Sequence, residues 1–349
     1  MTEQVARAPL RAGAGREQLC LLTGATGFIG GRLAARLLAE GYAVRALARP
    51  GSDTSVLERL GVEIAQGDLR DAASLQRAAM GAVNVLHCGA LVSDWATVKE
   101  LRAINVGGTR ALADAAVRAS VRRFIHVSST DVYGHPGGGP IDEERQPAGF
   151  ANWYSQTKLE AEAEVRRAMA DSGLSAVILR PATVFGPGSR DVVGEIARAI
   201  RGGHMLLIGG GRAVAGLCYV ENLLDAMLIC LSHDAAPGMS FNVTDALAVT
   251  WREFCDGLAA GMGARRVRFS LPYPLAAGLA LGLESSYRVA RAATGLTLPP
   301  LLSRQAVQVL GRDQDFSNAK LRQAVGWEPR VGYEQGLGAT LAWIASETR

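Results

Sequence analysis

The stretch "LLTGATGFIGGRL", residues 21–33, carries glycines at three-residue intervals between an apolar run and a helix-like segment. The run at residues 19–22 indicates a buried strand, and residues 28–40 indicate a helix that Gly41 closes. Glycines let such a turn approach a pyrophosphate, whose charge is met by free N–H groups at the helix N-terminus. Although GxxGxxG differs from the usual GxGxxG, we interpret it as a dinucleotide-binding turn rather than a plain turn. The residues assigned to the cofactor here are Gly24, Thr26, Gly27, Phe28, Ile29 and Gly30.

The same unit of apolar run, turn and helical stretch repeats along the first half of the chain. Strands that alternate with helices predict a parallel, doubly wound sheet of the Rossmann type. Ligands then bind at the carboxyl ends of the strands. The runs are "LCLL" (19–22), "AVRALA" (43–48), "VEIA" (62–65), "VNVLH" (83–87), "RFIHVSS" (123–129) and "SAVILR" (175–180).

Beyond Pro181 the pattern loosens, and glycine- and proline-rich joints separate shorter elements. This change predicts a smaller C-terminal substrate-binding lobe beside the α/β sheet. The expected organisation is a disordered leader at 1–17, a nucleotide-binding domain at 18–185 with a return segment near 215–245, and a substrate lobe at 186–214 and 246–349.

Composition narrows the function classes. The 349 residues are 48% hydrophobic with a formal net charge of +4, which indicates a folded globular protein. No basic block or basic–aromatic stripe is present, so we expect no nucleic-acid partner. The five cysteines are scattered without a CxxC pair, which indicates buried thiols in a reducing compartment rather than disulfides or a metal site. The first 18 residues contain no apolar h-region, and we expect a cytoplasmic protein.

The apolar run "LPYPLAAGLALGLE", residues 271–284, is shorter than the roughly 20 residues needed to cross a bilayer. We favour a buried helix, and a membrane-surface helix or a lid over the substrate are the alternatives.

The ends of the second and third strands indicate the cofactor. Ala48 occupies the position where NAD-binding proteins carry an acid, and Arg49 follows it. An arginine there suits the 2′-phosphate of NADP, so we favour NADP(H), with NAD(H) as the alternative if Arg49 is only a loop cation. Asp68 and Leu69 are expected beside the adenine; a helix N-cap is the other role open to Asp68.

Two further strand ends add candidate site residues. Gly89 and Ala90 suit a chain passing under the nicotinamide ribose, whereas His87 is expected to be a satisfied core histidine. "HVSSTDVYG" places hydroxyls at the end of the fifth strand, where they can bond a substrate oxygen. In "WYSQTKLE", Tyr154 and Lys158 lie four residues apart and share one helical face.

Together "TGATGFIG", "GDLRD", "SSTDVYG", "YSQTK" and "RPATVFGPG" resemble the extended short-chain dehydrogenase/reductases in order and approximate spacing. "CYVENLLDAML" (218–228), "NVTDALAVTWREF" (242–254) and "FSNAKLRQAVGWEP" (316–329) look most like its 3β-hydroxysteroid dehydrogenase branch.

The resemblance implies roles for the matching residues. Tyr154 would be the acid/base, and the ammonium of Lys158 would favour its phenolate and hold the nicotinamide ribose. Ser129 would orient the substrate oxygen, with Ser128 as the alternative. Asn105 would steady the site or serve the structure. Residues lining the carboxamide end of the nicotinamide would include Pro181, Thr183 and Val184.

The leading hypothesis is an NAD(P)-dependent oxidoreductase that interconverts a secondary alcohol and a ketone on a steroid-like or long-chain 3-hydroxy/3-keto substrate. The alternatives are a nucleotide-sugar 4-epimerase with tightly bound NAD and a cofactor-sensing protein without turnover. Dehydration is disfavoured because Thr130 and Asp131 follow Ser129, so the first of the two acids that dehydratases of this family carry is missing. The resemblance also implies a homodimer built on residues 97–118 and the helix of Tyr154.

Overall fold

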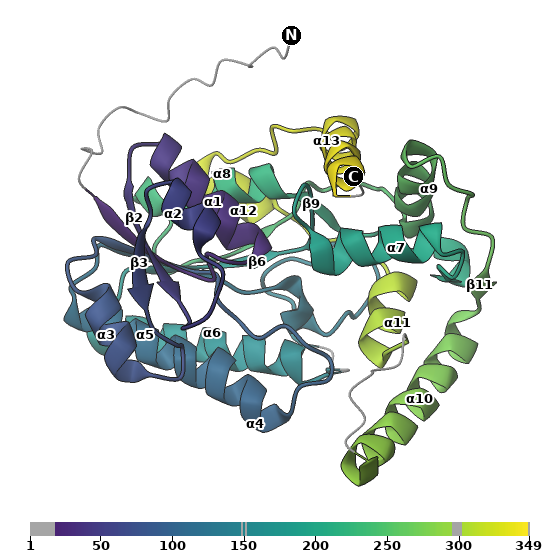
Figure 1. The fold of residues 1–349 in the computed structure, drawn as a ribbon, viewed down its shortest axis with the longest axis horizontal. Helices are drawn as coiled ribbons and strands as arrows, with labels where there is room; N and C mark the ends of the chain where they lie inside the picture. Colours follow the sequence, from purple (N-terminus) through teal and green to yellow (C-terminus); the bar gives the residue numbers. More distant parts are fainter. Residues whose placement is uncertain (1–17, 148, 151, 295–301, 348–349) are drawn as a thin grey trace.

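A computed structural model describes residues 18–147, 149–150, 152–294 and 302–347 (Figure 1). The expected leader at residues 1–17 lies outside the described residues.

The centre of the fold is a seven-stranded sheet in which every pairing is parallel. This confirms the predicted α/β class and the doubly wound sheet. The strand order is β10-β6-β5-β4-β1-β2-β3, so the order reverses between β1 and β4 and opens a crevice at their carboxyl ends. The strands are β1 (Leu19–Thr23), β2 (Ala43–Ala48), β3 (Glu63–Gln66), β4 (Asn84–His87), β5 (Arg123–Val127), β6 (Ala176–Pro181) and β10 (Ser240–Val243).

Helices cover both faces of the sheet (Figure 1) because successive strand residues point to opposite sides. Leu21 belongs to the core under one helical layer, whereas its neighbour Leu22 belongs to the core under the other. The first layer contains α3 (Ala72–Ala79), α5 (Gly108–Arg118) and α6 (Trp153–Ser172); α4 (Val98–Leu101) and a π-helical turn (Arg102–Gly107) lead into α5. The second contains α1 (Phe28–Ala39), α2 (Ser55–Arg59), α8 (Val220–Ser232) and α12 (Ala319–Val325).

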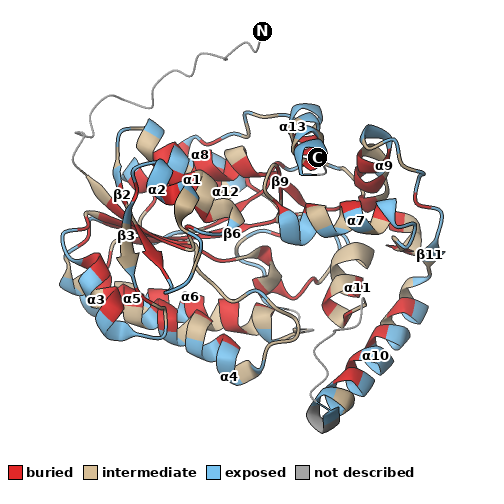
Figure 2. Ribbon diagram, in the orientation of Figure 1, coloured by how far each residue is buried: buried red, intermediate tan, exposed pale blue. Residues whose placement is uncertain are grey.

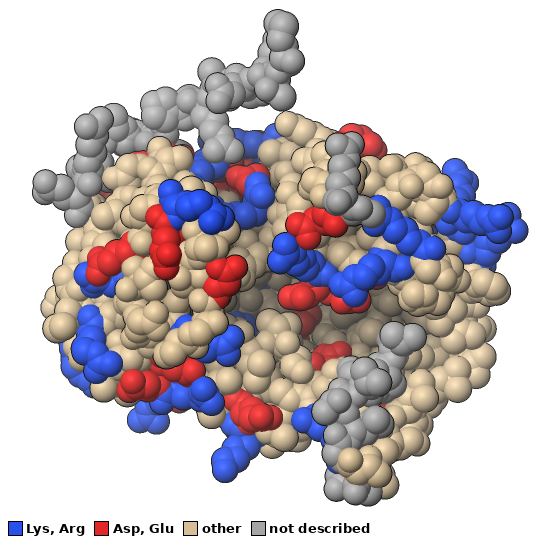
Figure 3. All heavy atoms as spheres, in the orientation of Figure 1, with Lys and Arg blue, Asp and Glu red and all other residues tan. Residues whose placement is uncertain are grey.

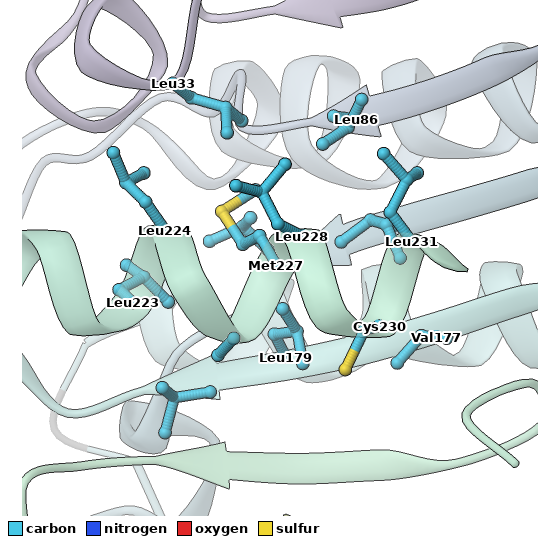
Figure 4. Close-up of a cluster of buried hydrophobic side chains, with 14 of the residues drawn as sticks. Leu33, Leu86, Val177, Leu179, Leu223, Leu224, Met227, Leu228, Cys230 and Leu231 are labelled. Atoms are coloured by element: carbon cyan, nitrogen blue, oxygen red, sulfur yellow. The ribbon is translucent and has the colours of Figure 1, made fainter. Parts of the chain in front are cut away.

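The second layer has a continuous apolar core. Figure 4 shows Leu223, Met227 and Leu231 of α8 gathered with Leu33 of α1 and Leu179 of β6. All five side chains are fully buried, and Figure 2 shows the same burial running through the sheet. Each such side chain contributes roughly 1.5–3 kcal/mol on removal from water.

A smaller region with its own cores follows the sheet. One core joins α7 (Glu195–Arg201), α9 (Trp251–Gly261) and α13 (Tyr333–Ser346) with the strand pair β7 (Thr183–Phe185) and β9 (Leu217–Tyr219). Another joins α10 (Tyr273–Thr294) and α11 (Arg304–Gly311) with the pair β8 (Leu207–Ile208) and β11 (Ser270–Leu271).

The division into domains stays a proposal. Residues 316–327 return to the sheet, where Phe316, Leu321 and Trp327 are buried in the core beside α8. We therefore propose the predicted division, with the return segment near 215–245 in the nucleotide-binding domain, and add residues 316–327 to that domain.

The preference for a buried helix at residues 271–284 is wrong in part. The helix α10 buries Ala276, Ala280 and Glu284, but Leu275 and Leu279 on its other side are exposed. Among the described residues, none of the helices has the length and apolar character needed to span a bilayer.

A buried ion pair fixes α6 against the sheet. Glu162 is fully buried, and both its carboxylate oxygens accept hydrogen bonds from the Arg180 guanidinium of β6, at 2.9 and 2.7 Å. Arg180 also donates to the hydroxyl of Tyr133, which donates in turn to Asn242 of β10. Since Glu162 lies one helical turn beyond Lys158, this pair sets the height of the Tyr154–Lys158 face above the strands.

We expect Glu162→Gln to lower the free energy of unfolding by about 3 kcal/mol, because it removes one partner of a buried charged pair. Chemical denaturation followed by circular dichroism measures the loss. Glu160→Gln in the same helix, α6, is the matched control. Glu160 pairs with the exposed Arg102 outside this helix, so the substitution should lower the free energy of unfolding by less than about 1 kcal/mol.

The pH dependence has a defined sign. Burial opposes ionisation of Glu162, but the Arg180 bonds and charge outweigh it and lower the pKa of this carboxyl. Its contribution to stability is therefore present above the unfolded pKa of about 4.3 and is lost as the pH falls. Equal losses for the two variants, or a Glu162 effect that does not shrink in acid, would contradict this role.

Candidate functional site

The crevice at the strand ends is a cleft of about 850 Å³. Figure 3 shows the face of the molecule hollowed near its centre, with charged side chains of both signs around the hollow. Every cofactor-binding and catalytic residue predicted from the sequence lines this one cleft: Gly24, Thr26, Gly27, Phe28, Ile29, Gly30, Arg49, Asp68, Leu69, Gly89, Ala90, Ser129, Tyr154, Lys158, Pro181, Thr183 and Val184.

The glycine turn lies between β1 and α1. Gly24 has a φ of +72°, and a Cβ on it would lie 2.8 Å from the backbone of Cys88. A Cβ on Gly30 would lie 2.2 Å from the carbonyl oxygen of Gly24. Gly27 is the N-cap of α1, and the first turn of this helix contains no acidic residue. The turn therefore presents helix N–H groups to the cleft without a competing carboxylate, which suits a pyrophosphate.

The part of the cleft at the ends of β2 and β3, where the adenosine was expected, contains two arginines. Ala48 closes β2, Arg49 is exposed beside it, and the Arg70 guanidinium binds both carboxylate oxygens of Asp68 at 2.9 and 2.8 Å. This ion pair lowers the pKa of Asp68 to about 2. The N-cap role left open for Asp68 is wrong, because Asp71 accepts the bond from Ala73 N that caps α3.

The loop after β4 is held by the protein itself. Asn105 accepts a bond from Leu91 N at 2.8 Å and donates to Leu91 O and Thr157. In this structure Asn105 therefore ties the loop to α6, which is the structural role. His87 is buried between the hydroxyls of Thr23 and Thr109, at 2.7 and 2.9 Å, as expected of a core histidine.

Lys158 is buried at the base of the cleft, where its ammonium donates to the carbonyl oxygen of Val127 at 2.7 Å. Burial lowers its pKa to about 8, although nearby Glu162 opposes the change. Tyr154, one turn earlier, is half-buried. Burial and the carboxylates of Asp131 and Asp94 raise the pKa of Tyr154, which is opposite to the predicted influence of Lys158.

Ser129 stands at the end of β5 as the N-cap of the turn Thr130–Tyr133, and its hydroxyl accepts a bond from Asp131 N. It is half-buried, whereas Ser128 is buried, so Ser129 is the serine more open to the cleft.

Polar residues that sequence reasoning missed gather at the far end of the cleft. The ring of His135 lies 2.8 Å from the side chains of Gln314 and Gln305 and 3.2 Å from the Asp131 carboxylate. Burial lowers the pKa of His135, but the bond and charge of Asp131 outweigh it and the net shift is upward. The sequence feature that could have indicated this group is the histidine directly after "VYG", but its glutamine partners lie more than 160 residues away along the chain.

Asp94, also missed, joins three parts of the site. It accepts hydrogen bonds from Asn152, the N-cap of α6, and from Ser303, the N-cap of α11. One carboxylate thus fixes the starts of both helices that border the cleft.

The comparisons with known proteins agree with this geometry. Residues 20–244 match the NAD dependent epimerase/dehydratase family. The chain is 31% identical to the 4-hydroxy-2-methyl-3-oxo-4-farnesyl-3,4-dihydroquinoline-1-oxide ketoreductase of Stigmatella aurantiaca, over 91% of this chain and 94% of that protein. It is 30% identical to a 3 beta-hydroxysteroid dehydrogenase/Delta 5-->4-isomerase of Mycobacterium tuberculosis, over 93% and 90%. The solved structure of MoeE5 with UDP-glucose and NAD is 25% identical with a TM-score of 0.74, over 95% of this chain and 99% of that one.

Fold and cleft thus define an NAD(P)-binding protein of the Rossmann class, an oxidoreductase or epimerase. The chain belongs to the NAD-dependent epimerase/dehydratase family, the extended short-chain dehydrogenase/reductases, as its motifs indicated.

The tight glycine turn that suits a dinucleotide leaves no room for a side chain at Gly30. We expect Gly30→Ala to weaken NADPH and NADH binding by more than about tenfold, since its Cβ would displace the Gly24 carbonyl and open the turn. Fluorescence titration measures the affinity.

Gly338→Ala in α13 is the matched control, because a Cβ there meets no atom within 4 Å. If Gly30→Ala binds the cofactor like the control, the turn is not the pyrophosphate site.

Proposed function

We propose that this protein is an NAD(P)-dependent oxidoreductase that interconverts a secondary alcohol and a ketone on a hydrophobic substrate. The observation that carries the proposal is that Ser129, Tyr154 and Lys158 line the same cleft as the glycine turn. A hydroxyl, a phenol and an ammonium beside a dinucleotide site are the groups needed to manage a carbonyl oxygen.

The bound nicotinamide would supply or accept the hydride. Tyr154 would pass the proton to or from the substrate oxygen, and Ser129 would donate a hydrogen bond to that oxygen as negative charge develops. Lys158 would hold the ribose and keep a positive charge near the phenol.

The charges of the site favour the protonated phenol. Burial together with Asp131 and Asp94 raises the pKa of Tyr154, so the hydroxyl keeps its proton at neutral pH. That is the form that can protonate a carbonyl oxygen, and it supports action as a ketone reductase.

The substrate class is supported by the lining of the cleft and by the relatives. Val92, Val192, Trp251 and Val309 contribute apolar surface to the cleft, beside the polar group around His135. The two curated relatives are named for a farnesyl-bearing dihydroquinoline oxide and for a steroid, both large and apolar. A steroid-like or long-chain 3-hydroxy/3-keto compound fits such a surface.

NADP(H) is the proposed cofactor, with NAD(H) as the alternative. Ala48 leaves no acid to bind the adenosine ribose, and two cations line this end of the cleft, Arg49 and Arg70. The charge of Arg49 also contributes to the lowered pKa of Asp68, so this guanidinium lies within electrostatic reach of the cleft wall.

The second candidate is a nucleotide-sugar 4-epimerase with tightly bound NAD. It is favoured by the likeness to MoeE5, whose structure contains UDP-glucose and NAD. Ala48 argues against it, because tight NAD binding in this fold uses an acid at that position. A cofactor sensor without turnover would not need Tyr154 and Lys158 together.

Two further expectations remain proposals. We propose a homodimer through residues 97–118, which end in α5, and through α6; α5 and α6 lie side by side on one face of the sheet. We also propose a cytoplasmic location, which the five free cysteines support because they suit a reducing compartment.

The test of the function is a panel of steroid ketones, 3-ketoacids and UDP-sugars with NADPH or NADH. We expect absorbance loss at the nicotinamide band with an apolar ketone and NADPH, and no epimerised sugar. Epimerisation of a UDP-sugar without net cofactor consumption would replace the proposal by its alternative.

We expect Tyr154→Phe to lower kcat about 10³-fold while leaving cofactor affinity nearly unchanged, because only the proton donor is removed. Stopped-flow turnover and NADPH titration measure the two effects. Tyr42→Phe, before the amino end of β2, is the control and should retain full activity. Parallel loss of affinity and turnover would assign Tyr154 a structural role.

We expect Arg49→Ala to weaken NADPH binding about 30-fold and to leave NADH binding within about twofold, since a charged contact to the 2′-phosphate contributes roughly 2 kcal/mol. Calorimetric titration of both cofactors measures the difference. Arg59→Ala, an exposed arginine on α2, controls for lost surface charge. Equal effects on the two cofactors would make Arg49 a loop cation.

A further inference from the structure

Exposed apolar side chains are concentrated in one short part of the chain. Of the thirteen large hydrophobic residues that stand exposed in the described chain, six lie between residues 269 and 289. Such a concentration differs from the scattered exposure that is normal for a protein surface and marks an interaction site. The six are Phe269, Leu275, Leu279, Leu281, Leu283 and Val289.

Three of these side chains, Leu275, Leu279 and Val289, define a solvent-facing apolar face on α10. Leu281 and Leu283 are exposed on either side of this face, and Phe269 precedes the helix. The opposite face packs toward α11 through Ala276 and Ala280, which lie one turn apart, and the buried Tyr287 lies on the same side two turns further along. At 100° per residue, Leu275, Leu279 and Val289 point away from that face, and no charged residue lies between them on it. From Leu275 to Val289 this face is about 21 Å long, within a helix of 22 residues.

The ends of this face are strongly basic. Residues 262–294 contain five arginines and a single acid, so this segment alone has the excess of four positive charges that the whole chain shows. Arg265, Arg266 and Arg268 are exposed before α10, and Arg288 and Arg291 are exposed near its end. The single acid, Glu284, is buried and paired with Arg304 of α11 at 2.7 Å, and the exposed Arg288 lies 3.7 Å from the same carboxylate.

Aromatic rings stand beside the basic end of α10. A hollow of about 430 Å³ is lined by Trp95, Trp153, Tyr287, Arg288 and Arg291, among others. The rings of Trp95 and Tyr287 meet edge to face at 4.9 Å, and Trp153 is 40% exposed. Of these rings Trp153 is exposed and Tyr287 is buried, and an exposed tryptophan next to arginine is typical of protein that sits at the headgroup level of a bilayer.

We propose that α10 and the preceding residues 265–269 bind the surface of an anionic phospholipid membrane. The leucines of the apolar face enter the boundary between headgroups and acyl chains, and the flanking arginines pair with lipid phosphates. The helix lies along the surface, in agreement with the absence of a bilayer-spanning helix among the described residues.

Charge selects a membrane over a second copy of this chain. Both ends of the apolar face are basic, so two copies paired through it in either direction would set arginines against arginines. Like charges across an interface cost several kcal/mol, whereas an anionic surface neutralises all five.

The position of α10 near the cleft suggests a role for membrane binding in substrate entry, and this role rests on the proposed function. The helix α11, on which α10 packs, supplies Gln305 and Val309 to the far end of the cleft. A bound membrane therefore lies next to the end where a hydrophobic ketone would enter. Membrane binding itself is independent of any activity.

Vesicle flotation of the full chain tests the proposal, with phosphatidylcholine alone and with about one third phosphatidylglycerol. We expect binding to the anionic vesicles only, and reversal by salt. Arg265→Gln/Arg266→Gln/Arg268→Gln should weaken it about a hundredfold, since each cation near the surface contributes roughly fivefold. Leu275→Gln/Leu279→Gln/Val289→Gln should also lose binding.

The matched control is Val56→Gln/Met80→Gln/Met239→Gln, which alters three equally exposed apolar residues elsewhere and should bind like the parent. Thermal melting checks that all variants fold, and turnover of a water-soluble ketone without vesicles should be unchanged in each. Three results would overturn the proposal: no binding to anionic vesicles, arginine and leucine variants that bind like the control, or a lipid-free dimer that the leucine variant abolishes.

Discussion

One buried ion pair, between Glu162 of α6 and Arg180 of β6, positions the chemistry of this molecule. It joins the helix of Tyr154 and Lys158 to the strand that runs into Pro181 and the following wall of the cleft. Tyr133 and Asn242 extend the same network to the edge strand. A charged pair in the interior tolerates little displacement, because any gap leaves a desolvated charge without its partner. Helix and cleft wall therefore move as one body.

Burial has the largest influence on the protonation of Tyr154 and Lys158 in the cleft. It raises the pKa of Tyr154 and lowers that of Lys158, so both groups are pushed toward their neutral forms. Glu162 counters the effect at Lys158, and Asp131 adds to the effect at Tyr154 while pairing with His135. The carboxylates around the site thus add to or oppose the effect of burial, and two of them, Asp94 and Asp131, also hold the local structure together.

The features that could be predicted from the sequence are those that depend on residues close together along the chain. The glycine turn, the strand ends and the Tyr154–Lys158 spacing each lie within a few residues, and the six predicted strands match the observed ones within two residues at each end. The misses depend on distant partners. Asp94 binds Ser303 across 209 residues, and His135 binds Gln314 across 179. Aspartate is a common N-cap residue, so the sequence alone could not distinguish Asp68 from Asp71. The structure shows that α3 begins directly after Asp71. The apolar composition of α10 could not show which side it buries.

The return of residues 316–327 to the sheet has a consequence for biosynthesis. Phe316, Leu321 and Trp327 complete an apolar layer most of whose other members are made far earlier, from β1 through β10. Until residues 316–327 leave the ribosome, that layer exposes an apolar surface, which this segment covers in the folded protein. A fragment that stops after β10 would therefore need a chaperone or aggregate, although it contains all seven strands of the central sheet.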